Sequence, residues 1–388
     1  MKKMNKQKTR QEENKLPKSH ETDVLIIGGG LAGCVLAYQL LEQGKRVIVL
    51  DEPHHSTASR VGAGIINPIS GKRYSSIWNA KEVLPSALNF YRKCTDELPR
   101  KPDRIYCREV PTLRMFASEE ERNFWETKRA QEQHFAQLVE THTVDELYDK
   151  LSISASYGAL QFLSWHVDTE VLVADLRNAL ASRDALWEDF FDETLLKLEE
   201  NAAGGLRYKN FSAQQIVFCH GWKAHKSSLW GTLPLSPAKG ELLTVRLKSA
   251  SLRHLLVKGT FLLPLFLSSA SENASQETDL VRIGASYEWE QLDERINADV
   301  GMSLLESAQA IFPTEMHIVE HRAGVRPAAK DSRPFLGVHP RYKQCFVMNG
   351  FGAKGAVLVP YCAEQLALLL DGQGNIPREI ALERFSRN

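Results

Sequence analysis

The sequence predicts an α/β fold in which a domain with a parallel sheet is intertwined with an α+β domain built on an antiparallel sheet. Three observations predict it. A strand, a glycine turn, a helix and a second strand follow one another near the N-terminus within about 30 residues, as in a βαβ unit. Strand-like segments with alternating polarity fill residues 241–287. A further strand, glycine turn and helix close the chain, so the parallel domain is expected to be interrupted by the other.

The composition is that of a globular protein. The chain of 388 residues and 43.7 kDa allows one large or two ordinary domains, at roughly 150 residues per domain. Hydrophobic residues make up 43% and charged residues 25%, enough to bury a core. No stretch approaches the ~18–20 uninterrupted apolar residues of a membrane-spanning helix. The N-terminus lacks the apolar segment of a secretory signal.

The cysteine and histidine patterns argue against metal and nucleophile chemistry. The six cysteines form no C-x-x-C pair, so neither a disulfide framework nor a zinc site is predicted, and a reducing cytoplasm is expected. The twelve histidines form no H-E-x-x-H motif, and the sequence has no G-x-S-x-G elbow. We predict no metal site.

The charge is unevenly placed. Lys and Arg number 48, as do Asp and Glu, but residues 1–20 hold seven basic and two acidic residues, which leaves a net charge of −5 from residue 21 onward. We interpret residues 1–20 as a disordered basic leader; an arm for an anionic partner is the alternative. A mildly acidic body lacks the positive face of a nucleic-acid-binding protein, so no such partner is predicted.

The elements follow in order from local patterns. Residues 23–27 are a continuous apolar run, typical of a buried parallel strand. Residues 31–43 carry an apolar helical stripe that stops at Gly44, and residues 46–50 form the second strand. Later helices are predicted at 81–97, 118–136, 168–183, 300–312 and 355–370, and later strands at 215–219, 241–247, 255–267, 279–287, 315–322 and 344–348. Residues 268–278 read as a polar loop.

Residues Gly28 to Gly33 fit the fingerprint G-x-G-x-x-G. The first glycine makes the tight turn, the second lets a pyrophosphate approach the backbone, and the third lets helix and strand pack closely. The helix start at Leu31 and Ala32 offers free N–H donors to phosphates. Asp51 ends the second strand, where a carboxylate can accept both hydroxyls of a ribose. This context favours a Rossmann-like dinucleotide site over a purely structural turn.

The fingerprint does not separate NAD from FAD, but a resemblance does. Residues 23–52, followed by 59–64, resemble the opening of the D-amino-acid oxidase-like family, which includes glycine and sarcosine oxidases and the FAD module of the tRNA 5-methylaminomethyl-2-thiouridine biosynthesis enzyme. Residues 283–288, 324–337 and 349–355 resemble the family's later motifs in the same order. The resemblance spans about residues 22–371.

The resemblance implies noncovalent FAD and a domain plan. The FAD-binding domain comprises 21–75, 152–225 and 322–388, and the substrate domain 76–151 and 226–321. Gly324 to Arg326 contain no cysteine of the kind that holds flavin covalently in sarcosine oxidases. The implied cofactor contacts are Gly28, Gly30, Leu31, Ala32, Gly33, Asp51, Glu52, Ser59, Arg60, Gly62, Ala63, Gly64, Gly221, Gly350, Gly352, Ala353, Lys354 and Gly355. A plain turn is the alternative for residues 62–64.

Two residues are predicted to be catalytic. In glycine and D-amino-acid oxidases, the arginine of the G-x-R-P element clamps the substrate carboxylate, and Arg326 stands in that element here. The planar guanidinium suits bidentate capture, whereas a structural arginine is the alternative. Lys354 lies in the last glycine turn and is expected to add a cationic partner to the flavin; a solvated lysine is the alternative.

Two further features bear on the substrate. Phe261 stands where glycine oxidases resemble Tyr-x-x-Pro, so a hydroxyl that helps hold the carboxylate is missing, which argues against a plain glycine-like substrate. Lys72 and Arg73 follow the flavin loop and either attract an anionic substrate or are solvated.

The resemblance thus implies an FAD-dependent oxidoreductase that oxidises the C–N bond of a primary or secondary amine, an amino acid in particular, by hydride transfer to flavin. Its expected partner is a small-molecule amine. The alternatives are a tRNA wobble-uridine oxidase that removes a carboxymethyl group, and a non-catalytic FAD-binding protein.

Overall fold

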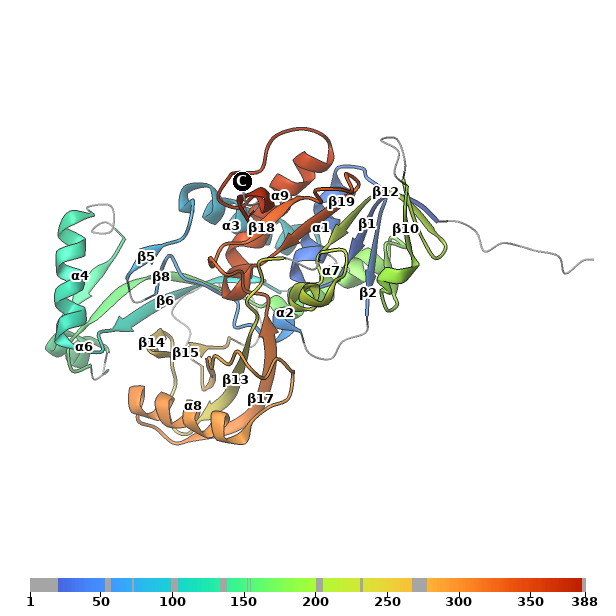
Figure 1. Cartoon of the computed structure of the whole chain (residues 1–388). Helices are drawn as coiled ribbons and strands as arrows, with labels where there is room; N and C mark the ends of the chain where they lie inside the picture. The colour runs from blue at the N-terminus through green and yellow to red at the C-terminus, as the bar shows by residue number, and fades with distance from the viewer. Residues whose placement is uncertain are drawn as a thin grey trace, which may run out of the picture.

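The computed structural model describes residues 20–385, apart from 53–56, 72, 99–103, 133–137, 152, 154, 200–204, 231–232 and 267–277. Within these residues the chain forms an eight-stranded sheet, a nine-stranded sheet and a two-stranded ribbon, which confirms the mixed α/β fold (Figure 1). Residues 1–19 of the predicted leader, Lys72 and nearly all of the polar loop 268–278 lie outside the described residues. His20, which the prediction placed in the leader, is the first residue of strand β1.

The first sheet has the parallel core that the sequence predicts. Its order is β10-β11-β12-β1-β2-β9, with β19 beside β12 and β18 beside β19. Strands β1, β2, β9, β12 and β19 run parallel. Their bounds are β1 His20–Ile27, β2 Val47–Asp51, β9 Leu186–Glu188, β12 Phe211–Phe218 and β19 Cys345–Asn349; antiparallel partners are β10 Leu196–Leu198, β11 Leu206–Tyr208 and β18 Phe335–Val338.

Strand β1 is buried on both faces, which explains its continuous apolar run. Val24 and Ile26 share one core cluster with helices α1 (Leu31–Glu42), α3 (Ala80–Glu97), α7 (Thr169–Ala181) and α9 (Gly355–Leu370). Leu25 and Ile27 join a second cluster on the opposite face with Tyr208, Phe218 and Trp230. Helix α9, counted from Gly352, is long and apolar enough to cross a membrane, but 61% of that window is buried, as in the core helix of a globular protein.

The second sheet has the order β17-β13-β16-β15-β14-β6-β8-β3, with β7 paired to β8. All its pairs are antiparallel except β14 with β6. Helix α8 (Ala298–Ile311) packs against it in its own core cluster. The strands are β3 Ile65–Ile66, β6 Cys107–Met115, β7 Glu140–His142, β8 Ala159–Val167, β13 Ala238–Leu247, β14 Leu255–Lys258, β15 Thr260–Pro264, β16 Leu280–Gly284 and β17 Met316–Arg326.

Smaller elements connect these layers. Helix α2 (Ala58–Val61) packs against α7 and β17, between the two sheets (Figure 1). The other short elements are α4 Glu119–Gln131, α6 Val144–Leu151, β4 Ile69–Ser70, β5 Ser75–Ser76 and the 3-10 turns η1 Glu193–Leu195, η2 Gly221–Lys226, η3 Gly352–Lys354 and η4 Leu382–Phe385. Side chains cap two of the helices: Ser118 Oγ accepts from Glu121 N–H, and Asp168 Oδ1 accepts from Val171 N–H.

The structure differs from the predictions at four points. The single strand predicted at 255–267 is wrong: Gly259, with φ +74°, reverses the chain and makes the hairpin β14–β15. The strand predicted at 315–322 continues to Arg326. Strands β6 and β8 were not predicted, because charged and polar residues interrupt their apolar positions. Strands β3 and β8 pair in the second sheet, although the predicted plan places their segments in the FAD-binding domain.

The first helix lies against the end of β1 with no spare room. A Cβ on Gly33 would collide with the carbonyl oxygen of Gly28. By contrast, a Cβ on Gly355, in the first turn of α9, would have its nearest neighbour among the described residues, the Cβ of Phe351, 3.8 Å away. Each glycine lies in the first turn of a helix that begins at the same cavity, so Gly355 serves as the matched control for Gly33.

We expect Gly33→Ala to lower the free energy of unfolding of the FAD-free protein by about 1–3 kcal/mol, because the methyl group forces helix and strand apart. Gly355→Ala is expected to change it by less than about 1 kcal/mol. Urea denaturation followed by circular dichroism measures both. Equal losses in the two variants would contradict the packing role of Gly33.

Candidate active site

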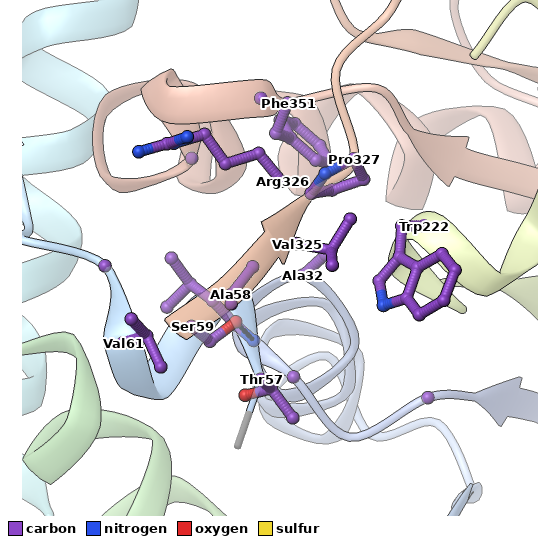
Figure 2. A pocket seen from close by; sticks show the side chains of 18 of the residues that line it. Ala32, Thr57, Ala58, Ser59, Val61, Trp222, Val325, Arg326, Pro327 and Phe351 are labelled. Atoms are coloured by element: carbon purple, nitrogen blue, oxygen red, sulfur yellow. Dashed lines mark hydrogen bonds between the residues drawn. The ribbon is translucent and has the colours of Figure 1, made fainter. Parts of the chain in front are cut away.

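A cavity of about 930 Å³ opens at the carboxyl ends of β1, β2, β12 and β19 and reaches the second sheet. Ligands of open α/β sheets bind at this edge. Figure 2 shows Arg326, Pro327 and Phe351 on one side of the cavity, facing Thr57, Ala58 and Ser59 on the other, with Trp222 at one end. Most of the predicted cofactor residues line it: Gly28, Gly30, Leu31, Ala32, Asp51, Glu52, Ser59, Gly62, Ala63, Gly64, Gly221, Gly352, Ala353 and Gly355.

The glycine turn forms one wall of the cavity. Gly28 has φ +104°, and a Cβ there would meet the carbonyl group of Cys219 on the neighbouring strand. Helix α1 therefore starts directly at the cavity, where its first N–H groups have no intrahelical acceptor. One of them, Leu31 N–H, donates to Ser59 Oγ over 2.9 Å. Ser59 thus fixes the loop 57–64 against the helix start, while Ala32 remains on the cavity surface.

Asp51 is held by an arginine that sequence reasoning missed. Arg177 Nη1 lies 2.5 Å from Asp51 Oδ2, and its Nη2 lies 2.9 Å from Glu188 Oε1. Burial opposes the charge of Arg177, but the two acids outweigh burial and raise its pKa. A Cβ on Gly29 would collide with the Arg177 guanidinium and with Asp51. The only signal in the sequence is a charged residue on the apolar stripe of the helix 168–183.

Glu52 and His220 lie at the far end of the same wall. Glu52 Oε2 pairs with Lys223 Nζ over 2.7 Å. His220 packs against Phe191 and Phe218, with ring centroids 5.6 and 5.0 Å away. Burial lowers the pKa of His220 to about 4, so the ring is neutral at pH 7. His220 is therefore uncharged, and Glu52 is already paired with Lys223.

A buried asparagine, also missed, joins the two glycine turns. Asn349 ends β19 with a side chain 2% exposed. Its Nδ2 donates to Gly221 O, and its Oδ1 accepts from Gly350 N–H, each over 2.8 Å. Gly350 and Gly352 follow with φ +84° and +54°, and helix α9 then starts at the cavity. A polar residue at the end of an apolar strand is the signal that points to Asn349.

Arg326 lies at the end of β17 and lines the cavity. Its Nη1 donates to the carbonyl oxygens of Lys239 and Ser286 over 3.2 and 3.1 Å. The guanidinium carbon stacks 4.3 Å from the ring centroid of Tyr287, and burial lowers the arginine's pKa. Within the residues that the structure describes, no carboxylate lies within ion-pair distance of Arg326. The two carbonyls fix the plane of the guanidinium and leave Nε and Nη2 available for a ligand.

An apolar wall borders Arg326. Leu242, Val257 and Phe261 come from three strands of the second sheet and line the cavity. A Cβ on Gly284 would meet the side chains of both Leu242 and Phe261, so this glycine opens the space between them.

Four predicted site residues do not line the cavity: Gly33, Arg60, Gly350 and Lys354. Lys354 is exposed in the turn before α9, and its catalytic role stays a prediction.

The comparison with protein families decides what this site holds. A family model described as "DAO: FAD dependent oxidoreductase" matches residues 23–369. The chain belongs to this family. Its FAD-dependence agrees with the glycine turn, the two helix starts and Asp51, which together form the cradle that a dinucleotide needs. The resemblance stated from the sequence is thereby confirmed.

Relatives cover nearly the whole chain. The glycine oxidase of Geobacillus kaustophilus is 25% identical over 377 residues, 91% of this chain and 94% of that protein. The glycine oxidase of Pseudomonas putida is 23% identical, with 90% and 94% covered. Among solved structures, the Geobacillus kaustophilus glycine oxidase superposes with a TM-score of 0.78 at 24% identity, covering 94% of this chain and 99% of that one. Iminodiacetate oxidase from Chelativorans gives 0.73 at 20% identity, covering 92% and 97%.

The low pKa of His220 generates a test of pH dependence. A folded pKa of about 4 lies below the ordinary value of 6.5, so the unfolded state binds the proton more tightly. The contribution of neutral His220 to the free energy of unfolding is complete above pH 6.5, and it falls as the pH drops from 6.5 towards 4. Between pH 7 and 5, wild type should lose about 1–2 kcal/mol more stability than His220→Gln, measured by urea unfolding with saturating FAD. If wild type and His220→Gln lost equal stability between pH 7 and 5, the low pKa assigned to His220 would be contradicted.

Proposed function

We propose that the protein oxidises the C–N bond of a primary or secondary amine that carries a carboxylate, an amino acid in particular, with noncovalently bound FAD. The observation that carries the proposal is Arg326, a half-buried guanidinium in the cavity without a carboxylate partner among the described residues. A free fork in a partly desolvated site is suited to a substrate carboxylate. The names of the relatives, glycine oxidases and an iminodiacetate oxidase, support the same substrate class.

The roles follow from the geometry. When bound, FAD supplies the acceptor for the hydride of the carbon that bears the amine, and the resulting imine hydrolyses in water. The start of α1, where Ser59 takes the N–H of Leu31 and Ala32 lies on the cavity surface, would hold the pyrophosphate, and Asp51, braced by Arg177, would accept the ribose hydroxyls. Arg326 orients the carboxylate through Nε and Nη2. No protein base is required if the amine binds in its neutral form. Lys354 adds positive charge beside the cavity residues Ala353 and Gly355.

The apolar wall narrows the substrate class. Leu242, Val257 and Phe261 offer no hydrogen-bonding group beside Arg326, and they are matched by an apolar side chain or N-substituent on the amino acid. Glycine would leave this wall in contact with water. The relatives' names favour amine oxidation over the tRNA-modifying and non-catalytic alternatives. We also propose a cytoplasmic location, which the six free cysteines support.

Arg326→Ala is expected to retain FAD with a nearly unchanged visible spectrum. Flavin reduction by the carboxylate-bearing substrate should fall about 30- to 1,000-fold in kcat/KM, because a charge-assisted bidentate contact worth about 2–4 kcal/mol is lost. Arg326→Lys should recover little, since a point charge does not reproduce the fork. The control is the exposed Arg246→Ala, which should leave kcat/KM unchanged.

The deciding comparison uses an amino acid and its decarboxylated amine as substrates. If Arg326 binds the carboxylate, the variant loses activity on the amino acid and little on the amine. Equal losses on both, with a lowered melting temperature and loss of flavin, would identify Arg326 as a structural residue instead.

The apolar wall predicts a substrate order in anaerobic flavin reduction. Amino acids with an apolar side chain or N-substituent should reduce the flavin at least tenfold more efficiently than glycine, because one or two buried methylene groups contribute about 1–3 kcal/mol. Phe261→Ala should diminish this preference while FAD stays bound. A wild-type protein that prefers glycine would refute the assignment of the wall.

A further inference from the structure

The guanidinium of Arg326 occupies the place where a side chain of Gly240 would lie. Gly240 on β13 pairs with Gly324 on β17, two residues before Arg326. A Cβ on Gly240 would collide with Nη1, Nη2 and Cζ of Arg326. The φ angle of Gly240 lies outside the left-handed region, so the glycine is needed here for room and not for its backbone conformation. Any larger residue at this position would therefore displace the guanidinium.

The ring of Tyr287, from a second segment, contacts the same guanidinium. Cζ of Arg326 lies 4.3 Å from the ring centroid, within the range of a cation–π contact. Tyr287 lines the FAD cavity, and Trp289 stacks against its ring, with centroids 6.0 Å apart and planes at 25°. Because a guanidinium is planar, a ring on it and a strand against it restrict its rotation.

Backbone hydrogen bonds hold the segment that carries Tyr287 against β13. Lys239 N–H donates to Glu288 O over 2.7 Å, and Glu288 N–H donates to Lys239 O over 3.0 Å. On the other side of Tyr287, Ser286 Oγ accepts from Glu241 N–H over 2.8 Å. The residues before and after Tyr287 are thus tied to the strand, so the position of the ring does not depend on its contact with the guanidinium.

We propose that Tyr287 is a positioning residue of the carboxylate site: its ring, together with the space at Gly240, holds the guanidinium of Arg326 in one orientation. This inference rests on the proposed capture of a substrate carboxylate by Arg326. Bidentate capture requires both N–H groups of the fork in the plane of the carboxylate. A long side chain that is ordered before the ligand arrives loses less rotamer entropy on binding, so the affinity for a carboxylate rises.

The experiment uses the FAD-loaded protein and butyrate, a carboxylate without an amine, and follows binding by the change in flavin absorption. Tyr287→Leu, which removes the ring, should weaken butyrate binding about five- to thirtyfold, as expected for a cation–π contact in a partly desolvated site. Tyr287→Phe keeps the ring and should bind butyrate within about twofold of wild type. The matched control is Tyr157→Leu, at an exposed tyrosine in the turn before β8, which should change nothing. FAD affinity and melting temperature should stay the same in all three variants.

Gly240→Ala tests the other side of the guanidinium. The added methyl group displaces the guanidinium, so butyrate binding should weaken at least tenfold and the melting temperature should fall. In an Arg326→Ala background the guanidinium is gone, so adding Gly240→Ala should leave the melting temperature unchanged. An equal fall in both backgrounds would show that the methyl group clashes with something other than Arg326 and would overturn the role of Gly240.

Equal butyrate affinity in wild type and Tyr287→Leu would overturn the positioning role. So would equal losses in Tyr287→Leu and Tyr287→Phe, because the hydroxyl and not the ring would then be responsible, and so would loss of FAD from Tyr287→Leu, which would make the ring a structural element. Arg326→Ala separates this inference from the proposed function. If that variant loses butyrate while Tyr287→Leu keeps it, only the positioning role fails; if wild type binds no butyrate, or Arg326→Ala binds it equally, the capture by Arg326 fails as well.

Discussion

The close approach of helix α1 to the end of strand β1 is the constraint on which the rest of the site depends. Gly33 lies so near the carbonyl of Gly28 that no side chain fits between them. Because the helix starts there, its free N–H groups open onto the cavity rather than into the core. The same geometry brings Ser59 to Leu31 and leaves Gly29 against Asp51 and Arg177. One steric contact therefore sets the positions of the start of α1, of Asp51 and of the loop 57–64 around the cavity.

A second contact repeats this arrangement at the other end of the chain. Asn349 joins the turn at Gly221 to the turn at Gly350, so the ends of β12 and β19 are fixed to each other. Helix α9 then starts beside α1, and the two helices share one core cluster. Two helix N-termini directed at one cavity add their positive potential to that of the cationic side chains that line it, Lys223, Lys226 and Arg326. An anionic cofactor is favoured there even though Lys354 is exposed.

Local patterns predicted much of the fold, whereas contacts between distant segments were beyond their reach. The βαβ unit and the glycine turns depend on neighbouring residues, so sequence reasoning placed them well. Arg177 was missed because its role depends on Asp51, 126 residues away. Strands β6 and β8 were missed because polar residues interrupt their apolar positions, and their pairing joins segments that are distant in the sequence. The hairpin at Gly259 was not predicted, because a single glycine within an apolar run is also compatible with a continuous strand.

Two arginines on one face of the second sheet show how the fold separates binding from structure. Arg322, with two acids at 2.6 Å, holds α7 against the sheet and has no charge left for a ligand. Arg326, four residues along the same strand, has only carbonyl oxygens and an aromatic ring as partners among the described residues. Carbonyls orient a guanidinium without neutralising it, so its charge remains available. The same sheet face thus uses arginine in two ways, and the difference is set by which acids stand opposite. A carboxylate introduced opposite Arg326 would therefore occupy its fork and remove the free charge on which the proposed capture of a substrate carboxylate depends.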